Sequence, residues 1–273
     1  MKKEEDTMYW VKDGLKYCKV CGEPKEAYFS AGGFMGMKKH SRQCACDRQA
    51  YEEEQRYFKE KEHQELVSRN TRICFEESRM EEWTFENADM SDAVMNRAKS
   101  YVENWSKMKR NHIGLLFWGP IGTGKSYVSG CITNALLKQE VTVKMTNFNT
   151  IIDDIFPLAD KTEYINALAG YELLIIDDLG VERNSEYALG IVFSVIDRRI
   201  RSGRPVIVTT NLPLKELKNE TMLEKKRIYD RILEMCTPIY VGGTSKREKI
   251  ANIKMDKAKK LLDGAEWRLN ANE

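Results

Sequence analysis

Alternating apolar and polar stretches predict an α/β domain that begins near Arg72. Short runs rich in Leu, Ile and Val are typical of strands buried on both faces of a parallel sheet. The strands are expected at 115–118, 141–146, 173–178, 205–211 and 238–241. Longer stretches between these runs carry apolar residues at helical spacing, so the chain alternates strands with helices as a layered α/β fold requires.

Helices are predicted before, between and after the strands. Apolar residues from Val94 to Met108 share one helical face, and Asp89 or Ser91 is expected to cap that helix. The further helices are expected at 127–136, 149–169 with a break at Pro157, 185–201, 222–233 and in the tail to 262. The faces rich in apolar residues are expected to form the core of the domain.

The N-terminal part has a different character. Residues 47–69 are dense in Glu, Lys, Arg and Gln, which predicts a solvated helix that joins two domains. The segment before it has too little apolar content for a core of its own. We therefore expect a small N-terminal domain at 1–50, a charged helical linker at 51–71 and the α/β domain at 72–273.

Composition and charge narrow the class of protein. The chain has 273 residues, of which 42% are hydrophobic and 32% charged, as in an ordinary soluble protein. A net charge of +2 is too small to argue for nucleic-acid binding by itself. No run approaches the ~18–20 apolar residues of a membrane span, and no apolar run follows Met1–Asp6, so a cytoplasmic protein is expected.

The segment Gly119-Pro120-Ile121-Gly122-Thr123-Gly124-Lys125-Ser126 matches a phosphate-binding loop between a strand and a helix. Its glycines allow backbone N–H groups to surround a phosphate, the lysine reaches the β- and γ-phosphates, and the serine hydroxyl suits Mg²⁺. The expected nucleotide-binding residues are Gly119, Gly122, Thr123, Gly124, Lys125, Ser126 and Tyr127. A glycine-rich turn without a ligand is the alternative.

Two carboxylates end the apolar run at 173–176. In enzymes with this loop, an acid at this place holds Mg²⁺ and a second acid orients or deprotonates the attacking water. Asp177 is therefore assigned to the metal and Asp178 to the water. The alternative is that both only end the strand and cap the next turn.

Polar residues and arginines downstream supply the remaining candidates. Asn211, or Thr210, follows the next strand and could hydrogen-bond the γ-phosphate, although an asparagine near Pro213 also suits a turn. Arg227 and Arg231 lie four residues apart on a helix. One of them could serve a neighbouring subunit's nucleotide, or both could form ordinary ion pairs with acids such as Glu224 and Asp230.

Four cysteines, Cys18, Cys21, Cys44 and Cys46, form two close pairs in the N-terminal segment. In a cytosolic chain this pattern predicts a structural Zn²⁺ site, whose binding energy would help so small a segment to fold. His40 could replace one thiolate or lie on the surface. A redox pair is the alternative, but the βαβ setting of such pairs is absent here.

These motifs together resemble the DnaC/DnaI-type helicase loaders, a branch of the AAA+ ATPases that also includes the IstB-type transposition ATPases. The resemblance covers roughly residues 72–250. It implies Walker A at 119–126, Walker B at Asp177 and Asp178, sensor 1 at Asn211 and an arginine finger at Arg231. The cysteine cluster is similar to the zinc domain with which some loaders contact the helicase.

The resemblance further implies ATP or ADP with Mg²⁺, a replicative DNA helicase and single-stranded DNA as partners, and self-association into a ring or spiral. Two alternatives are an IstB-type helper of a transposase and a non-hydrolysing, zinc-stabilised DNA-binding adaptor. The chain also departs from the family pattern. Asp178 is one methylene shorter than the usual Glu, which suggests slow, switch-like hydrolysis, and Arg247 is the local candidate for a second sensor because no helical lid domain follows.

Overall fold

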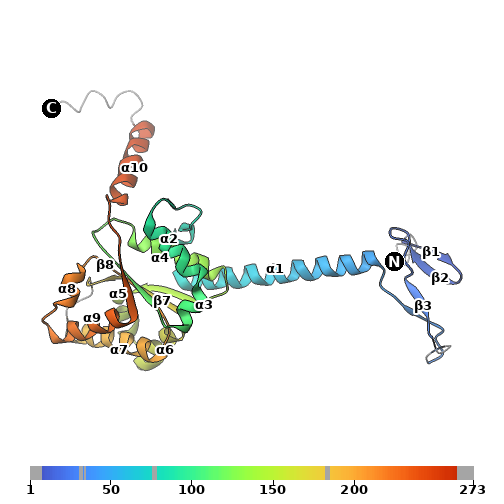
Figure 1. Cartoon of the computed structure of the whole chain (residues 1–273), viewed down its shortest axis with the longest axis horizontal. Coiled ribbons are helices and arrows are strands. Elements are labelled where there is room, and N and C mark those ends of the chain that lie inside the picture. Colours follow the sequence, from blue (N-terminus) through green and yellow to red (C-terminus); the bar gives the residue numbers. More distant parts are fainter. Residues whose placement is uncertain (1–7, 31–32, 34, 76–78, 182–184, 263–273) are drawn as a thin grey trace. The chain divides into compact units, whose positions relative to one another are not determined.

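Five parallel strands form the sheet around which residues 67–273 are organised in the computed structural model (Figure 1). The structure describes residues 8–30, 33, 35–75, 79–181 and 185–262. The strands are β5 (Gly114–Trp118), β6 (Val143–Asn147), β7 (Leu173–Leu179), β8 (Val206–Thr210) and β9 (Cys236–Tyr240). Their order is β6-β7-β8-β5-β9 and every neighbouring pair is parallel, which confirms the predicted sheet.

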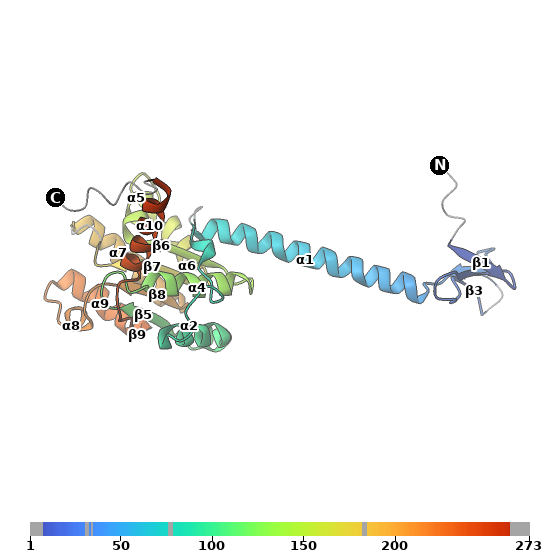
Figure 2. The ribbon, with the colours of Figure 1, turned by 90° about the horizontal axis from the view of Figure 1, so that it is seen from above.

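Helices cover both faces of this sheet (Figures 1 and 2). One apolar cluster packs α2 (Ala93–Glu103), α3 (Trp105–Arg110) and α4 (Lys125–Leu137) on one face. A second cluster packs α5 (Phe148–Ile155), α6 (Lys161–Gly170), α7 (Glu186–Ser202) and α9 (Leu223–Met235) on the other. The short η2 (Arg79–Glu82), α8 (Leu214–Lys218) and α10 (Lys246–Leu262) complete the described elements of this unit.

The helix before the phosphate loop differs from the prediction at its start. Neither Asp89 nor Ser91 caps it; the Asp92 carboxylate accepts a 2.9 Å hydrogen bond from the Val94 amide. Asp89 instead accepts from the amide and hydroxyl of Ser91, which forms a turn before the cap. The helix is also divided in two at Asn104.

The N-terminal unit, residues 1–66, contains two antiparallel hairpins and part of a long helix. The hairpins are β1 (Tyr9–Lys12) with β2 (Leu15–Cys18), and β3 (Glu26–Tyr28) with β4 (Lys39–Ser41). Helix α1 (Ala45–Phe75) follows, and the division between the two compact units falls within it. None of the helices in the described ranges has the length and apolar character needed to cross a bilayer.

Candidate functional site

The phosphate loop joins β5 to α4 at the carboxyl edge of the sheet, as its sequence predicts. Gly124 has a φ of 103° and caps α4, a conformation that residues with side chains rarely adopt. A Cβ atom at Gly119 would lie 2.3 Å from the Val241 carbonyl oxygen. The loop therefore needs glycine both for its own path and for its close approach to the end of β9.

Lys125 is buried within this loop. Its ammonium donates hydrogen bonds to the carbonyl oxygens of Gly119, at 2.9 Å, and Pro120, at 2.7 Å. Burial lowers the pKa of Lys125, while the charges of Asp178 and Asp177 oppose that shift. The Lys125 ammonium is thus held inside the loop by two carbonyl oxygens. Phosphate oxygens could accept its hydrogen bonds in their place.

The two predicted carboxylates lie in a β-bulge. Ile176 pairs with Val208 and Leu179 with Thr210, so Asp177 and Asp178 together lie opposite the single residue between those partners. In a regular strand, consecutive side chains point to opposite faces, and a bulge re-aims them. Asp178 has a φ of 57°, in the left-handed region. This local geometry brings the Asp178 carboxylate to the nucleotide pocket.

Thr209, on β8, is the residue opposite the bulge. Its hydroxyl donates a 2.6 Å hydrogen bond to the Asp177 carboxylate and accepts a 2.9 Å hydrogen bond from the Asp178 amide. Burial raises the pKa of Asp177, and hydrogen bonds from the hydroxyls of Thr209 and Ser126 lower it. Thr209 was not among the predicted site residues, although a threonine within an apolar strand was the available signal.

Asn211 and Thr210 differ in where their polar groups lie. The Thr210 hydroxyl is buried and donates to the Leu179 carbonyl oxygen at 2.7 Å, so it is used within the sheet. Asn211 lines the nucleotide pocket, and its amide nitrogen lies 3.5 Å from the Asp178 carboxylate. Of these two predicted alternatives, Asn211 is the side chain that reaches the pocket.

One pocket, with a volume of about 480 Å³, brings most of the predicted residues together. Lys125, Ser126, Tyr127, Asp178 and Asn211 all contribute to its wall. The residues that the sequence analysis did not assign to it are Trp83, Asn87, Ala88, Asp89, Ile121 and Lys246. The pocket therefore extends beyond the phosphate loop over a mixed aromatic and polar surface, as a nucleoside requires.

The aromatic wall is held on α4. The rings of Trp83 and Tyr127 lie 5.7 Å apart between centroids. The amide of Asn134 donates to the carbonyl oxygens of Met80 and Trp83, each at 2.8 Å. A Cβ atom at Gly130 would lie 2.4 Å from the Trp83 ring, so this glycine makes room for the indole.

The start of α10 packs against the phosphate loop. The Lys246 amide donates a 2.8 Å hydrogen bond to the Gly122 carbonyl oxygen, and its ammonium lies 3.7 Å from the Asp92 carboxylate. Lys246 and Arg247 both line the pocket. Two cations therefore join Lys125 around this pocket, and Arg247, the local candidate for a second sensor, lies in its wall.

Arg231 does not belong to the residues described around this pocket. Its guanidinium lies 2.6 Å from the Asp197 carboxylate and 4.9 Å above the centroid of the Phe193 ring. Arg231 thus forms an ordinary ion pair, as the sequence alternative allowed, but with Asp197 and not with Glu224 or Asp230, the acids named as examples. The partner is on α7, because α9 packs along that helix.

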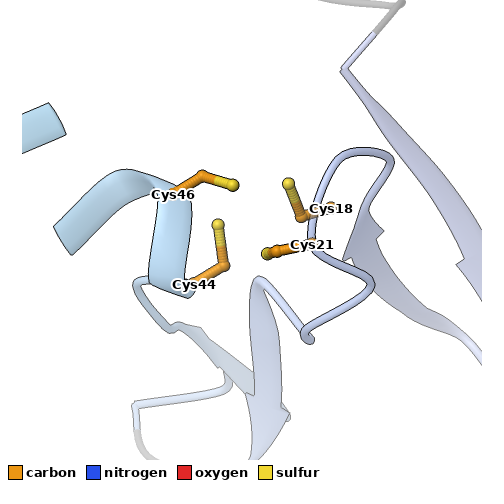
Figure 3. Close-up of side chains that lie close together, drawn as sticks. All are labelled: Cys18, Cys21, Cys44 and Cys46. Atoms are coloured by element: carbon orange, nitrogen blue, oxygen red, sulfur yellow. The ribbon is translucent and has the colours of Figure 1, made fainter. Parts of the chain in front are cut away.

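The four predicted cysteines converge in the N-terminal unit (Figure 3). Their sulfur atoms all lie within 4.8 Å of one another. A tetrahedral zinc ion with four Zn–S bonds of ~2.3 Å would place its sulfurs ~3.8 Å apart. The four free thiols are Cys18, Cys21, Cys44 and Cys46. Their donor set and spacing fit a Cys₄ zinc ion.

Hydrogen bonds around the thiols connect the two cysteine pairs. The Glu23 carboxylate accepts from the Ala45 amide at 2.7 Å, and Asp47 accepts from the Cys44 amide at 3.2 Å and pairs with Lys25 at 3.0 Å. Backbone N–H groups of Glu23 and Cys46 lower the pKa of the Cys21 thiol to about 6, whereas the hydrogen bond with Cys21 raises the pKa of Cys46 to about 12. A thiol with a low pKa is easily converted to the thiolate that binds metal.

His40 lies apart from this cluster. It is exposed on β4, where its ring lies 5.0 Å from that of Phe29 and its Nδ1 lies 3.0 Å from the Ser41 carbonyl oxygen. Among the described residues, the group able to hold a metal consists of the four cysteines without His40.

Comparison with known proteins identifies relatives of the chain. The replicative helicase loader DnaC of Escherichia coli (strain K12) is 31% identical over 144 residues, which are 51% of this chain and 56% of that protein. The replicative helicase loader DnaI of Bacillus subtilis (strain 168) is 23% identical over 181 residues, which are 60% of this chain and 58% of that protein. The chain thus spans little more than half the length of these relatives.

Solved structures agree on the fold. The crystal structure of DnaI has a TM-score of 0.53 at 20% identity and covers 62% of this chain and 92% of its own. The crystal structure of the DnaC helicase loader has a TM-score of 0.52 at 20% identity. The match covers 60% of this chain and 100% of that structure's chain. These matches show the same fold, and the relatives identified by sequence confirm the predicted resemblance to DnaC/DnaI-type proteins. Because the family described as IstB-like ATP binding protein matches residues 36–253, the chain belongs to that family.

Proposed function

We propose that this protein is a Mg²⁺-dependent ATPase that loads a replicative DNA helicase onto single-stranded DNA. The observation that carries the proposal is the pocket that joins Lys125, Ser126, Asp178 and Asn211 in a chain similar to proteins named replicative helicase loaders. The pocket supports the nucleotide chemistry, and the relatives' names support the helicase as partner.

Residues in and next to the pocket have distinct roles in this proposal. Lys125 would exchange its hydrogen bonds with Gly119 and Pro120 for the β- and γ-phosphates of ATP. Ser126 and Asp177 would hold Mg²⁺, which neutralises phosphate charge, and their oxygen atoms are the ligands that this ion prefers. Trp83 and Tyr127, whose rings are inclined by 53° to each other, would supply aromatic faces for the base.

Hydrolysis would depend on Asp178 and Asn211. Asp178 lines the pocket and would orient or deprotonate the attacking water, and Asn211, 3.5 Å from it, would contact that water or the γ-phosphate. The short aspartate side chain favours slow hydrolysis, which suits a switch between bound states.

Arg231 would act on the nucleotide of a neighbouring subunit in a ring or spiral. To reach it, its guanidinium must leave Asp197, so assembly would exchange an ion pair within the subunit for a contact with phosphate. Arg227, exposed four residues earlier on α9, is the other candidate for this role.

The cysteine cluster would bind a structural Zn²⁺ and stabilise the surface that contacts the helicase. We assign residues 1–50 to this zinc domain, 51–71 to a connecting helix and 72–273 to the ATPase domain. In so small a segment, zinc coordination would contribute folding energy that an apolar core cannot.

A second candidate is a helper ATPase for a transposase, favoured by the family description IstB-like ATP binding protein. The two candidates share the nucleotide chemistry and differ in the partner. Capture of partners from the native cell extract with ATP and Mg²⁺ present should recover a replicative helicase. Recovery of a transposase without a helicase would overturn the proposal in favour of the second candidate.

The nucleotide chemistry has a separate test. Lys125→Ala should abolish ATP hydrolysis measured with single-stranded DNA present, whereas Lys215→Ala, an exposed change on α8, should leave it unchanged. If the unaltered protein shows no hydrolysis and Lys125→Ala still supports replication in cells, the chain is a non-hydrolysing adaptor instead.

A further inference from the structure

A second concave site lies at the amino edge of the sheet, opposite the nucleotide pocket. It has a volume of about 350 Å³ and lies where α6 and α7 end. Its lining residues are Asn166, Ala169, Gly170, Arg198, Arg201, Ser202 and Arg204. Each five-residue strand spans ~16 Å, so this site is separate from the ATP site.

The buried guanidinium of Arg199 adds charge beneath this concavity. Arg199 is fully buried and donates hydrogen bonds to backbone carbonyl oxygens, including Tyr171 at 2.7 Å and Glu172 at 3.0 Å. Among the described residues, its hydrogen-bond partners are all backbone carbonyl groups, and none is a carboxylate. Burial, and then the charge of Arg204, lower the pKa of Arg199 to about 9, so it remains charged at neutral pH. A positive charge with no acidic partner in the described ranges is therefore fixed at this edge.

The arginines that line the concavity are only partly neutralised. Arg204 donates to the carbonyl oxygens of Ala169 and Gly170, and Arg201 pairs with Asp197 at 2.8 Å. Asp197 is shared with Arg231, so one carboxylate serves two guanidinium groups. Arg198 is exposed and forms no hydrogen bond or ion pair with the described residues.

The positive surface continues onto α3. The His112 ring contacts the backbone of Gly203. This contact joins the loop after α3 to the loop after α7. The last turn of α3 carries Lys107, Lys109 and Arg110, of which Lys109 pairs with Glu172. Cations thus extend along the loops that enter β5 and β8, as an extended polyanion would require.

We propose that the concavity lined by Arg198, Arg201 and Arg204 binds the phosphate backbone of single-stranded nucleic acid. Guanidinium groups bind phosphate through paired N–H donors, and arginines outnumber lysines in the concavity. This inference rests on the proposed function for the identity of the polymer and assigns a place to its contact. The place is remote from the phosphate loop and does not depend on it.

The test uses the full-length protein and a fluorescent single-stranded oligonucleotide. Arg198→Ala with Arg201→Ala removes two lining charges while keeping Arg199 and Arg204, whose hydrogen bonds hold the turn between α6 and β7. Anisotropy titration should show binding weakened by about tenfold. The slope of log K against the logarithm of the salt concentration should become shallower by about 1.4. Each of the two lost phosphate contacts on a single strand contributes ~0.7 to that slope. The control Lys215→Ala with Lys218→Ala removes two charges from α8 and should change neither quantity.

Each outcome bears on a different claim. If the unaltered protein binds no single-stranded DNA, the DNA part of the proposed function fails, and this inference with it. If the double arginine variant and the control bind DNA equally well, the inference fails while the proposed function stands. If the double arginine variant still binds DNA but no longer binds the partner protein recovered from extract, the concavity binds an acidic protein surface. The inference is then overturned.

Discussion

Thr209 shows at the scale of one residue how a hydroxyl can organise two acids. It contacts the side chain of Asp177 and the backbone of Asp178, so it fixes both residues of the bulge at once. Motif spacing identified the carboxylates because they follow an apolar run. It could not identify Thr209, since pairing across two strands depends on a register that a single sequence does not contain.

Replacing Thr209 by Val should lower the ATPase kcat by about tenfold to a hundredfold, because Asp177 and Asp178 lose the group that aims them. Thr209→Ser keeps the hydroxyl and should retain most of the rate. Steady-state hydrolysis with Mg²⁺ titration measures this, and thermal unfolding should show that both variants fold. Equal rates for Thr209→Val and the unaltered protein would contradict the role assigned to this hydroxyl.

Arg199→Met should destabilise the ATPase unit by about 3–5 kcal/mol, because several buried carbonyl groups lose their donor. Arg198→Met, one residue earlier but exposed, should change the free energy of unfolding by no more than about 0.5 kcal/mol. Urea unfolding of the two variants side by side gives the comparison. Similar unfolding midpoints would show that Arg199 does not stabilise this edge.

At the scale of elements, α4 supports the nucleotide site on two sides. Its first turn carries Lys125 and Ser126. Further along the helix, Gly130 leaves room for the Trp83 ring and Asn134 donates a hydrogen bond to the Trp83 carbonyl oxygen. The helix was predicted from apolar spacing, and that prediction was confirmed. The docking of residues 79–90 was not predicted, although Asn134 among the apolar residues of the C-terminal half of this helix was a signal for it.

Gly130→Ala tests this support. The new methyl group would overlap the Trp83 ring, so we expect nucleotide affinity to fall by about tenfold and stability to fall by about 1–3 kcal/mol. Gly190→Ala is the matched control in α7, where a Cβ atom meets nothing within 4 Å. That change should stabilise the protein by about 0.5–1 kcal/mol.

Fluorescent-nucleotide binding and thermal unfolding report the two effects of these glycine changes separately. A Gly130→Ala protein that binds nucleotide as tightly as Gly190→Ala would show that the Trp83 wall does not contribute to the site.

The strands were the most predictable elements because burial on both faces leaves long apolar runs. All five lie within two residues of their predicted starts and ends. The bulge in β7 was not predictable, since Asp177 and Asp178 read equally well as the regular end of a strand. The cap at Asp92 was missed because three polar residues within four positions can each start a helix.

At the scale of the whole molecule, the chain consists of two units with different sources of stability. Residues 67–273 bury two large apolar clusters, whereas the described part of residues 1–66 has few buried side chains, among them Cys18 and Cys44. Cysteine spacing alone predicted that these thiols would meet. Neither residue spacing nor the fold identifies the partner protein, because a helicase loader and a transposition helper can have the same nucleotide site.

Zinc removal should therefore affect one unit only. We expect about one zinc ion per chain by elemental analysis, and a chelator should make the N-terminal region sensitive to protease while ATP hydrolysis continues. Cys21→Ser should lose the zinc and His40→Ala should keep it, because His40 lies apart from the cluster. Loss of zinc from His40→Ala alone would contradict the Cys₄ assignment.

The left-handed backbone at Asp178 has a consequence for engineering. Aspartate tolerates this conformation better than most residues with side chains, because its short carboxylate can hydrogen-bond locally. A glutamate at this position would carry its carboxylate one methylene further from a main chain whose conformation suits aspartate. If Asp178 orients the attacking water as proposed, we expect Asp178→Glu alone to leave turnover slow, and a faster variant would require redesigning the bulge and its threonine together.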